Sequence, residues 1–380
     1  MTIPSSHNTI AKEWESSTDT FAAHAAGLHV PLSVTFELTA RCNLRCKMCY
    51  VALSPDDVKK QGRELTAAEW IDIGRQSIEA GSLYLLLSGG EPLIRDDFVE
   101  IYTALCKMGF IITINTNATL LSEKHFELFS KYPPTAVAVS LYGASPETYE
   151  KVSGNAAAFE QTLRGLEMLT KLPTNIEVRT TFIKDNMNEL DQVRAIANRY
   201  TKRFAINFLV FGSNRVETSE ALQCRMSPAE CMDLDISNFE YYEHLDECEK
   251  DPVDPEVEAY FDSLAPDRNY GMQLSPKVIP CLASKAMFCI TWDGKMLPCA
   301  TFEAPYTLPL EEGLKSAWER LPALFEDVKR PEECYGCELM EDDCPNCPGY
   351  MQADTGDFET KSEWLCGLAK ERNVRYMQTM

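Results

Sequence analysis

The pattern of apolar and polar residues between Val30 and Phe211 predicts alternating strands and helices. Six short runs rich in apolar and β-branched residues are each followed by a segment of helical periodicity. Several of the runs are almost continuously apolar, which is typical of strands buried on both faces of a parallel sheet. The predicted strands are Val30–Phe36, Ser82–Leu87, Phe110–Asn115, Ala136–Leu141, Ile176–Ile183 and Ala205–Phe211.

The predicted helices lie between these strands. The clearest start is the capping box Thr66–Glu69, which opens a helix running to about Ala80. In contrast, Ser54–Glu64 is so charged and polar that it is expected to be a loop. Further helices are predicted over Asp96–Met108, Ser122–Lys131, Ala157–Lys171 and Met187–Tyr200, with a short one near Ile10–Trp14.

These repeated units define the expected fold. Strand–helix units with short connections predict an α/β fold with a parallel sheet and right-handed crossovers. The alternation stops near Phe211, too early for a closed eight-stranded barrel. We therefore predict a partial six-stranded parallel (β/α)6 barrel with a cysteine-rich C-terminal domain. The expected regions are an N-terminal arm (1–29), the barrel core (30–212), an acidic, mostly helical bridge (213–275) and the C-terminal domain with its tail (276–380).

Charge and cysteine content narrow the possible partners. The formal net charge is −22, whereas nucleic-acid binding needs clustered positive charge. No apolar stretch is long enough to span a membrane, and no signal-peptide pattern opens the chain, so a cytoplasmic location is expected. Without a secretion signal, the 15 cysteines predict reduced thiols that ligate metal rather than a disulfide framework.

The stretch Glu37–Tyr50 follows the first predicted strand and holds Cys42, Cys46 and Cys49 at C-x3-C-x2-C spacing. Loops at the carboxyl ends of strands are where α/β folds place their active sites. Three thiolates on one loop can ligate three corners of a 4Fe–4S cluster and leave the fourth iron for an exogenous molecule. Three unrelated thiols, or an incomplete zinc site, are the alternatives for this spacing alone.

Cysteine density rises again after Cys281. The segment Met287–Pro298 is predicted to be a hairpin with Asp293-Gly294 at its turn, which places Cys289 near Cys299. Two C-x2-C pairs with six residues between them leave a zinc ribbon as an alternative, although ribbons usually have a wider gap. This region has eight cysteines, enough to ligate two clusters with four thiolates each: Cys281, Cys289, Cys299, Cys334, Cys337, Cys344, Cys347 and Cys366.

Four other cysteines have no motif spacing. They are expected to be structural or surface thiols, because a free cysteine often serves as a small apolar residue. They are Cys106, Cys224, Cys231 and Cys248.

The first cysteine motif resembles that of the radical S-adenosylmethionine (SAM) superfamily. The resemblance rests on C-x3-C-x-Φ-C, with Met48 where the family usually has an aromatic residue, and on the Gly-Gly-Glu-Pro sequence Gly89–Pro92. Tyr50, the next residue after the motif, is a possible substitute for that aromatic ring. The resemblance implies a partial barrel in which SAM chelates the open iron through its amino and carboxylate groups. It further implies reductive cleavage of SAM to methionine and a 5′-deoxyadenosyl radical.

The C-terminal cysteines resemble the SPASM domain appended to many radical SAM enzymes. Here one residue has shifted within the block Cys334–Cys347, and Cys289 is spaced differently from its counterpart. The resemblance implies two fully ligated auxiliary clusters, and therefore three 4Fe–4S clusters in all. By position, one auxiliary set is Cys281, Cys289, Cys299 and Cys347, and the other is Cys334, Cys337, Cys344 and Cys366.

The resemblance also implies where SAM binds. Gly89 and Gly90 would let the backbone approach the methionine moiety, and Glu91 would accept a hydrogen bond from its ammonium group. No catalytic acid or base is identified. The complete set of expected SAM contacts is Met48, Gly89, Gly90, Glu91, Pro92, Asn115, Asn117, Ser140 and Arg179.

The expected activity is hydrogen abstraction from a substrate carbon during oxidative cross-linking or dehydrogenation of a ribosomally made peptide. Ala300 follows Cys299 where related sulfatase maturases carry aspartate, which argues against that activity. The arm of 29 residues is too short for a winged-helix leader-binding module, so a separate leader-binding protein is one expectation. The electron donor would be a flavodoxin or ferredoxin.

Two alternatives stay open at this point. One is radical oxidation, decarboxylation or epimerisation of a small molecule such as a sugar or tetrapyrrole. The other is a non-enzymatic iron–sulfur electron carrier, which leaves Gly89–Pro92 without a function.

Overall fold

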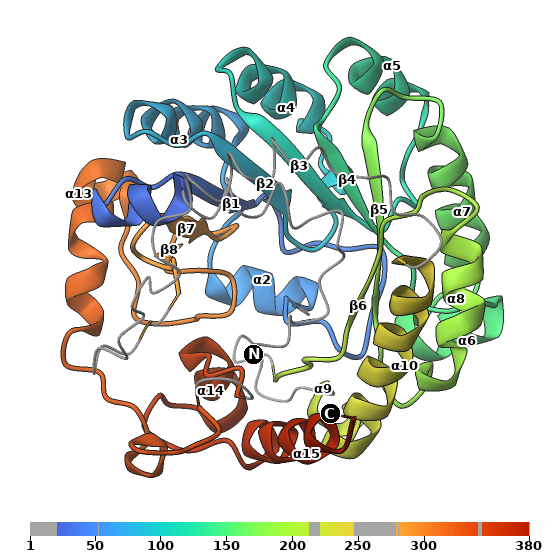
Figure 1. Cartoon of the computed structure of the whole chain (residues 1–380). Helices are drawn as coiled ribbons and strands as arrows, with labels where there is room; N and C mark the ends of the chain where they lie inside the picture. Colours follow the sequence, from blue (N-terminus) through green and yellow to red (C-terminus); the bar gives the residue numbers. More distant parts are fainter. Residues whose placement is uncertain are drawn as a thin grey trace, which may run out of the picture.

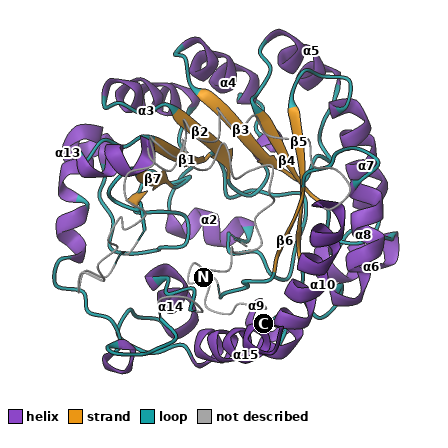
Figure 2. Ribbon diagram, in the orientation of Figure 1, coloured by secondary structure: helices purple, strands orange, loops and turns teal. Residues whose placement is uncertain are grey.

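A computed structural model describes residues 21–51, 53–212, 221–246, 279, 281–340 and 344–379. Its centre is an eight-stranded sheet with the strand order β6-β5-β4-β3-β2-β1-β7-β8 (Figures 1 and 2). Every neighbouring pair is parallel except β7 and β8, which are antiparallel. The strands are β1 (Ser33–Glu37), β2 (Tyr84–Ser88), β3 (Ile111–Thr116), β4 (Ala136–Ser140), β5 (Asn175–Thr181), β6 (Phe204–Asn207), β7 (Met287–Ile290) and β8 (Met296–Leu297).

The predicted α/β fold with six parallel strands in chain order is confirmed, and the sheet extends beyond it. β7 pairs with the outer edge of β1, where Thr35 aligns with Cys289. The predicted hairpin is therefore present, but it forms part of the main sheet. Asp293-Gly294 lies at its turn, and Gly294 has a φ of +92°, a conformation that glycine adopts without steric cost.

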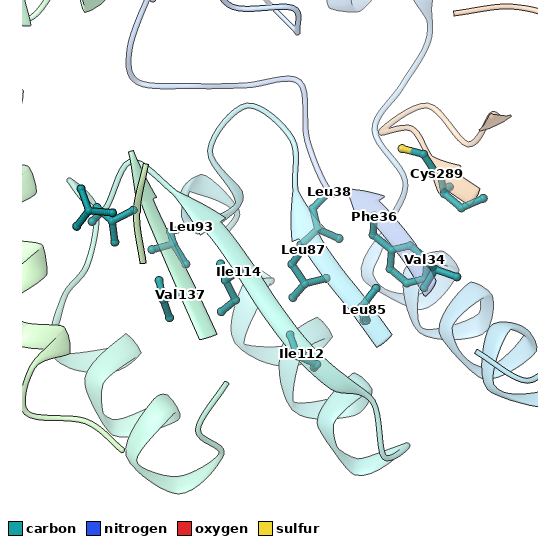
Figure 3. Close-up of a cluster of buried hydrophobic side chains, with 14 of the residues drawn as sticks. Val34, Phe36, Leu38, Leu85, Leu87, Leu93, Ile112, Ile114, Val137 and Cys289 are labelled. Atoms are coloured by element: carbon teal, nitrogen blue, oxygen red, sulfur yellow. The ribbon is translucent and has the colours of Figure 1, made fainter. Parts of the chain in front are cut away.

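Helices cover the outer face of the sheet. Those from α3 to α8 follow its curve in Figures 1 and 2. The sheet residues that alternate toward them are buried, including Phe36, Leu87 and Ile114, which pack with Trp70 in the main core (Figure 3). The helices are α2 (Pro55–Gln61), α3 (Ala67–Glu79), α4 (Phe98–Lys107), α5 (Glu123–Lys131), α6 (Pro146–Ser153), α7 (Ala158–Leu169), α8 (Leu190–Ala197), α9 (Ala221–Cys224), α10 (Pro228–Asp246), α12 (Pro309–Glu312), α13 (Leu314–Arg320), α14 (Pro348–Thr355) and α15 (Glu363–Thr379).

Two helices within the expected barrel core were not predicted from the sequence. The loop predicted over Ser54–Glu64 contains α2, because Ser54 caps the helix by accepting from the Asp57 amide and Pro55 follows at the first turn. Helix α6 has the same kind of start, with Ser145 accepting from the Thr148 amide before Pro146. The capping box at Thr66, in contrast, is present as predicted.

The C-terminal region bridges the two open edges of the sheet. The Tyr350 ring of α14 packs at a tilt against that of Phe211, just after β6, with ring centroids 4.8 Å apart. On the other side of α14, the Gln352 side-chain amide donates to the Ala304 carbonyl oxygen, 2.9 Å away in the segment after β8. The strands do not close into a barrel, and α14 spans between the segments that follow the two edges (Figure 1).

The expected bridge and arm are described only in part. Residues 213–220 and 247–278, including Cys248, lie outside the described residues, as does the helix predicted near Ile10–Trp14. The described part of the bridge is helical, as α9 and α10. Among the residues described, we find no helix that is both long and apolar enough to span a membrane.

Candidate active site

The loop with the first three cysteines is fixed by main-chain hydrogen bonds to a distant helix. The Arg45 and Lys47 amides donate to the carbonyl oxygens of Ser153 and Val152, at 2.9 and 3.0 Å, at the end of α6. Lys47 also forms an ion pair with Asp185, 2.8 Å away, in the segment after β5. The loop therefore adopts a defined path at the carboxyl end of β1.

The three thiols of this loop are partly buried and influence one another. Burial raises the pKa of Cys42 to about 11, with smaller contributions from Glu91 and Cys49 in the same direction. Burial also raises the pKa of Cys46, and the thiols of Cys49 and Cys42 add to that rise. The three sulfurs therefore lie within electrostatic reach of one another. A bound metal would reverse this trend by stabilising the thiolates.

The thiols are not arranged for a single ion. Within the described part of the chain, no three cysteine, histidine or carboxylate side chains form a group that could hold a metal ion. A cubane cluster is bound at separate iron corners, so its thiolates need not converge on one atom. The three thiols of this loop are soft sulfur ligands, and they do not converge on one ion. They therefore fit an iron–sulfur cluster better than a lone zinc ion.

The Gly-Gly-Glu-Pro loop packs directly on the start of the cysteine loop. The amides of Gly90 and Glu91 donate to the carbonyl oxygens of Thr39 and Arg41, at 2.7 and 2.9 Å. A Cβ on Gly89 would lie 2.5 Å from the Thr39 oxygen, and one on Gly90 would collide with the Arg41 oxygen. Both glycines are thus required for this loop-to-loop contact, whether or not SAM is bound.

Glu91 is fully buried and holds the end of β3. Its Oε1 accepts from the Leu93 amide at 3.1 Å and from the Thr116 hydroxyl at 2.8 Å. Its Oε2 accepts from the Asn117 amide at 2.7 Å. Burial raises the pKa of Glu91 to about 7, while these three donors oppose the rise. The carboxylate therefore joins the ends of β2 and β3, a role that the motif alone did not reveal.

The two asparagines predicted at this strand end differ in their surroundings. Asn117 is buried, and its side-chain nitrogen lies 3.0 Å from Asn43 Oδ1 and 3.8 Å from the Cys42 sulfur. The side-chain oxygen of Asn115 is buried without a hydrogen-bond partner. A buried acceptor of this kind is costly unless a ligand or water supplies the donor.

Ser140 and Arg179 are register partners at the carboxyl ends of β4 and β5. Arg179 is about half exposed and forms a bidentate ion pair with Glu177, with two N–O distances of 2.8 Å. Burial raises the pKa of Tyr142 well above its usual value, Cys46 adds to the rise and Ser140 opposes it. Tyr142 was not among the predicted residues, since a tyrosine at a strand end has no distinguishing sequence signal.

Met48 and Tyr50 occupy different environments. Met48 is buried in a cluster with Val152, Ile183 and Val210. The Tyr50 ring lies 6.0 Å from that of Phe211, whose other neighbour is Tyr350. The three rings thus connect the cysteine loop to α14.

Several polar residues that support the loop were missed by sequence analysis. Arg95 is buried and donates to the carbonyl oxygens of Leu38 and Leu65, at 2.8 and 2.9 Å. Glu64 hydrogen-bonds the Thr39 hydroxyl and forms an ion pair with Arg41. Their charges are common on protein surfaces, so only the tertiary contacts reveal them.

The C-terminal cysteines separate into two groups by their mutual effects. The pKa of Cys299 is raised to about 11, mainly by burial and to a smaller extent by the thiols of Cys347 and Cys281. Burial likewise raises the pKa of Cys334 to about 11, with additional effects from Cys366, Cys344 and Cys337. Cys344 and Cys347, although close in sequence, thus have different thiol neighbours.

Cys289 lies in β7 rather than in a loop. Its register partner is Thr35, so it faces away from the side of the sheet that buries Phe36 and Val34. Figure 3 shows its sulfur pointing away from these two side chains. Cys106, Cys224 and Cys231 are separate from both groups, and the last two are buried among apolar residues near α9 and α10.

Comparison with known proteins identifies the class. Residues 36–197 match the family model of the radical SAM superfamily. The chain therefore carries a radical SAM domain over these residues and is an enzyme of the radical SAM type. This domain implies SAM and a 4Fe–4S cluster as cofactors.

Its sequence relatives include enzymes with different substrates. The AdoMet-dependent heme synthase of Methanosarcina barkeri (strain Fusaro / DSM 804) is 29% identical over 343 residues, covering 87% of this chain and 95% of that protein. The PqqA peptide cyclase of Rhizobium meliloti (strain 1021) is 24% identical over 336 residues, covering 86% and 84%.

Solved structures show the same fold. SuiB of Streptococcus suis bound to S-adenosylmethionine has a TM-score of 0.67 at 16% identity, covering 92% of this chain and 81% of that one. The enzyme anSMEcpe with bound AdoMet has a TM-score of 0.66 at 16% identity, covering 92% and 98%. At these identities the likeness establishes the fold alone.

Proposed function

We propose that Cys42, Cys46 and Cys49 hold a 4Fe–4S cluster whose fourth iron binds SAM. The observation that supports this most is the packing of the Gly89–Pro92 loop on the start of the cysteine loop, at the carboxyl ends of β1, β2 and β3. When bound, the cluster supplies the electron that cleaves SAM to methionine and a 5′-deoxyadenosyl radical. The protein's own residues position SAM and shield the site.

The SAM contacts that we propose come from the same edge of the sheet. The unpartnered oxygen of Asn115 is suited to a hydroxyl or ammonium donor. The ion pair of Arg179 with Glu177 uses its Nε and Nη2 atoms, which leaves Nη1 to face a carboxylate. The remaining proposed contacts are Met48, Gly89, Gly90, Glu91, Pro92 and Ser140.

We further propose two auxiliary 4Fe–4S clusters in the C-terminal region. The separation of these cysteines into two sets of neighbouring thiols supports this proposal. One set contains Cys281, Cys299 and Cys347, and the other contains Cys334, Cys337, Cys344 and Cys366. Cys289, on the adjacent strand, is the proposed fourth ligand of the first set. A zinc ribbon would instead need Cys344 and Cys347 on the same ion, and their different neighbours argue against it.

The proposed substrate is a peptide, oxidised by cross-linking or dehydrogenation. This is supported by the likeness to PqqA peptide cyclases and to SuiB, of which one structure contains the precursor peptide SuiA. The auxiliary clusters would accept one electron from the substrate radical after hydrogen abstraction. We propose a cytoplasmic enzyme with a flavodoxin or ferredoxin as electron donor and a separate leader-binding protein.

A tetrapyrrole is the second candidate substrate. It is favoured by the relative named AdoMet-dependent heme synthase, which this chain matches over 95% of that protein's length. The two candidate functions share the same SAM site and differ in the substrate that binds beside it, a peptide or a tetrapyrrole.

Iron analysis and product mass test the proposal. Anaerobically reconstituted protein should contain about twelve irons per chain. A modified peptide should be lighter by about 2 Da, the mass of the two hydrogens lost in an oxidation. About four irons with stoichiometric zinc would contradict the auxiliary clusters. A peptide of unchanged mass with solvent deuterium at one carbon would indicate epimerisation, and turnover of a tetrapyrrole alone would favour the second candidate.

A further inference from the structure

We propose that Asn117 sets the reduction potential of the cluster on the first cysteine loop by donating a hydrogen bond to the Cys42 sulfur. The inference rests on the proposed function, because it takes Cys42 as a cluster ligand. Asn117 Nδ2 lies 3.8 Å from Cys42 Sγ, within the range of N–H···S hydrogen bonds. Asn117 is thereby assigned to the cysteine loop rather than to SAM.

The neighbours of the Asn117 amide fix which end faces the sulfur. Its Oδ1 accepts two hydrogen bonds from Thr119, one from the backbone amide at 3.0 Å and one from the hydroxyl at 2.6 Å. The nitrogen must then face the other way, where it meets Asn43 Oδ1 at 3.0 Å and the Cys42 sulfur. A flipped amide would place its nitrogen against the two Thr119 donors.

The backbone of Asn117 is fixed as firmly as its side chain. Its amide donates to Glu91 Oε2 at 2.7 Å, and its carbonyl accepts from the Thr162 hydroxyl at 3.0 Å. The residue is only 6% exposed, so water does not readily compete for its donor. Asn117 is therefore a preorganised donor, already oriented before any cluster is bound.

The Cys42 sulfur has a second donor that no substitution can remove. The Leu44 backbone amide lies 3.4 Å from the same sulfur, within the cysteine loop itself. Asn117 is thus the side-chain contribution to this sulfur's hydrogen bonding, and it comes from the segment just after β3. Asn43, between the first two cysteines, couples it to the loop by accepting from its nitrogen and donating to the Thr119 hydroxyl at 2.8 Å.

The physical effect follows from charge. Reduction adds one electron from a low-potential donor and makes or breaks no bond, so the thiolates become more negative. A hydrogen bond to a charged acceptor is stronger than one to a neutral acceptor, and it stabilises the more negative state. Hydrogen bonds to sulfur are among the factors that set the potentials of iron–sulfur clusters. Removing the Asn117 donor should therefore make the potential more negative.

The test is an EPR-monitored redox titration of the full-length, reconstituted protein without SAM. The cluster on the loop is identified by the signal that changes on a later addition of SAM. Asn117→Leu should lower the reduced-to-oxidised ratio about threefold at a fixed potential, a shift of about 30 mV at 59 mV per tenfold for one electron. Thr119→Val, which keeps Asn117 but removes one of the two hydrogen bonds that its oxygen accepts, should give a smaller shift in the same direction.

Asn175→Leu is the control, because it removes an exposed asparagine at the amino end of β5, whose side chain donates to the Thr135 carbonyl oxygen and not to Cys42. Its potential should equal that of the wild type. A second readout uses protein labelled with ¹⁵N-asparagine, in which the reduced cluster should show a weak ¹⁵N coupling that Asn117→Leu abolishes.

The outcomes separate the two levels of the proposal. An unchanged potential in both Asn117→Leu and Thr119→Val, with a SAM-responsive signal present, would overturn the role of Asn117. So would an equal shift in Asn175→Leu. If wild-type protein shows no SAM-responsive signal at all, the proposed function fails and this inference falls with it.

Discussion

The two cysteine-rich regions of this protein are held in place by different kinds of contact. In the first loop, the Arg45 and Lys47 amides bond to a helix more than a hundred residues away in sequence, and Glu91 bonds back to Arg41. In the C-terminal block Cys334–Cys347, the main-chain bonds at the cysteines are local, such as Cys337 N to Cys334 O and Cys344 N to Leu339 O, at 3.4 and 2.8 Å.

This difference separates a preformed site from one that depends on its ligand. The first loop borrows its shape from the sheet and α6, so it should keep that shape without metal. The main-chain bonds at the cysteines of the block Cys334–Cys347 are local, so metal–thiolate bonds would supply much of its order. Metal binding and folding are coupled in such regions.

Removing iron should have the largest effect, and it should change hydrogen exchange in the C-terminal region but not around the first cysteine loop. In protein treated anaerobically with a chelator, amides of residues 330–340 and 344–366 should exchange at least about tenfold faster with deuterium. Amides of β1 and β4 should change little, because parallel strands on both sides hydrogen-bond them. Equal acceleration in both regions, or in neither, would contradict the distinction.

Gly90→Ala should disrupt the first region alone. Gly90 lacks a positive φ, so the cost arises from the collision of the new Cβ with the Arg41 carbonyl, of order 3 kcal/mol in the free energy of unfolding. Gly109→Ala is the control, since its φ is +94° but its Cβ would meet nothing within 4 Å. It should cost only about 1 kcal/mol in urea denaturation. Equal costs for the two variants would refute the loop-to-loop packing.

Phe211→Ala should weaken the contact between the regions. Its ring lies between those of Tyr50 and Tyr350, and the side chain is partly buried, so we expect a loss of about 2 kcal/mol. Hydrogen exchange of α14 should speed up while that of β1 stays constant. Phe211→Leu should lose only about half as much free energy of unfolding as Phe211→Ala. Tyr335→Ala, at a residue 52% exposed, should stay within about 0.5 kcal/mol of wild type. A comparable loss in Tyr335→Ala would contradict this account.

Sequence patterns predicted the first region better than the second. The six parallel strands and the capping box at Thr66 follow from local periodicity and local hydrogen bonds. The pairing of β7 with β1 could not be predicted, because the aligned residues Thr35 and Cys289 are far apart in sequence and either edge of the sheet could accept a strand. Helix α2 was missed because its sequence is charged throughout and its stability comes from caps.

The candidate site shows a similar limit. The cysteine spacing and the Gly-Gly-Glu-Pro motif located it, because both are local signals. Their partners were not visible, since nothing in the sequence indicates that Glu91 bonds the Asn117 amide or that Gly90 lies against Arg41. The sequence predicts only SAM binding for the Gly89–Pro92 motif, whereas the structure shows that the motif also holds its own loop against the cysteine loop.

The most direct test of the account is SAM cleavage by variants of the two cysteine regions. Reconstituted, dithionite-reduced wild type and Cys334→Ala/Cys337→Ala should both release 5′-deoxyadenosine from SAM, measured by liquid chromatography, because the first loop keeps its open iron. Cys42→Ala/Cys46→Ala/Cys49→Ala should release none, while still containing about eight irons. Wild-type rates of 5′-deoxyadenosine formation in this triple variant would contradict the assignment of the first loop as the site of SAM cleavage.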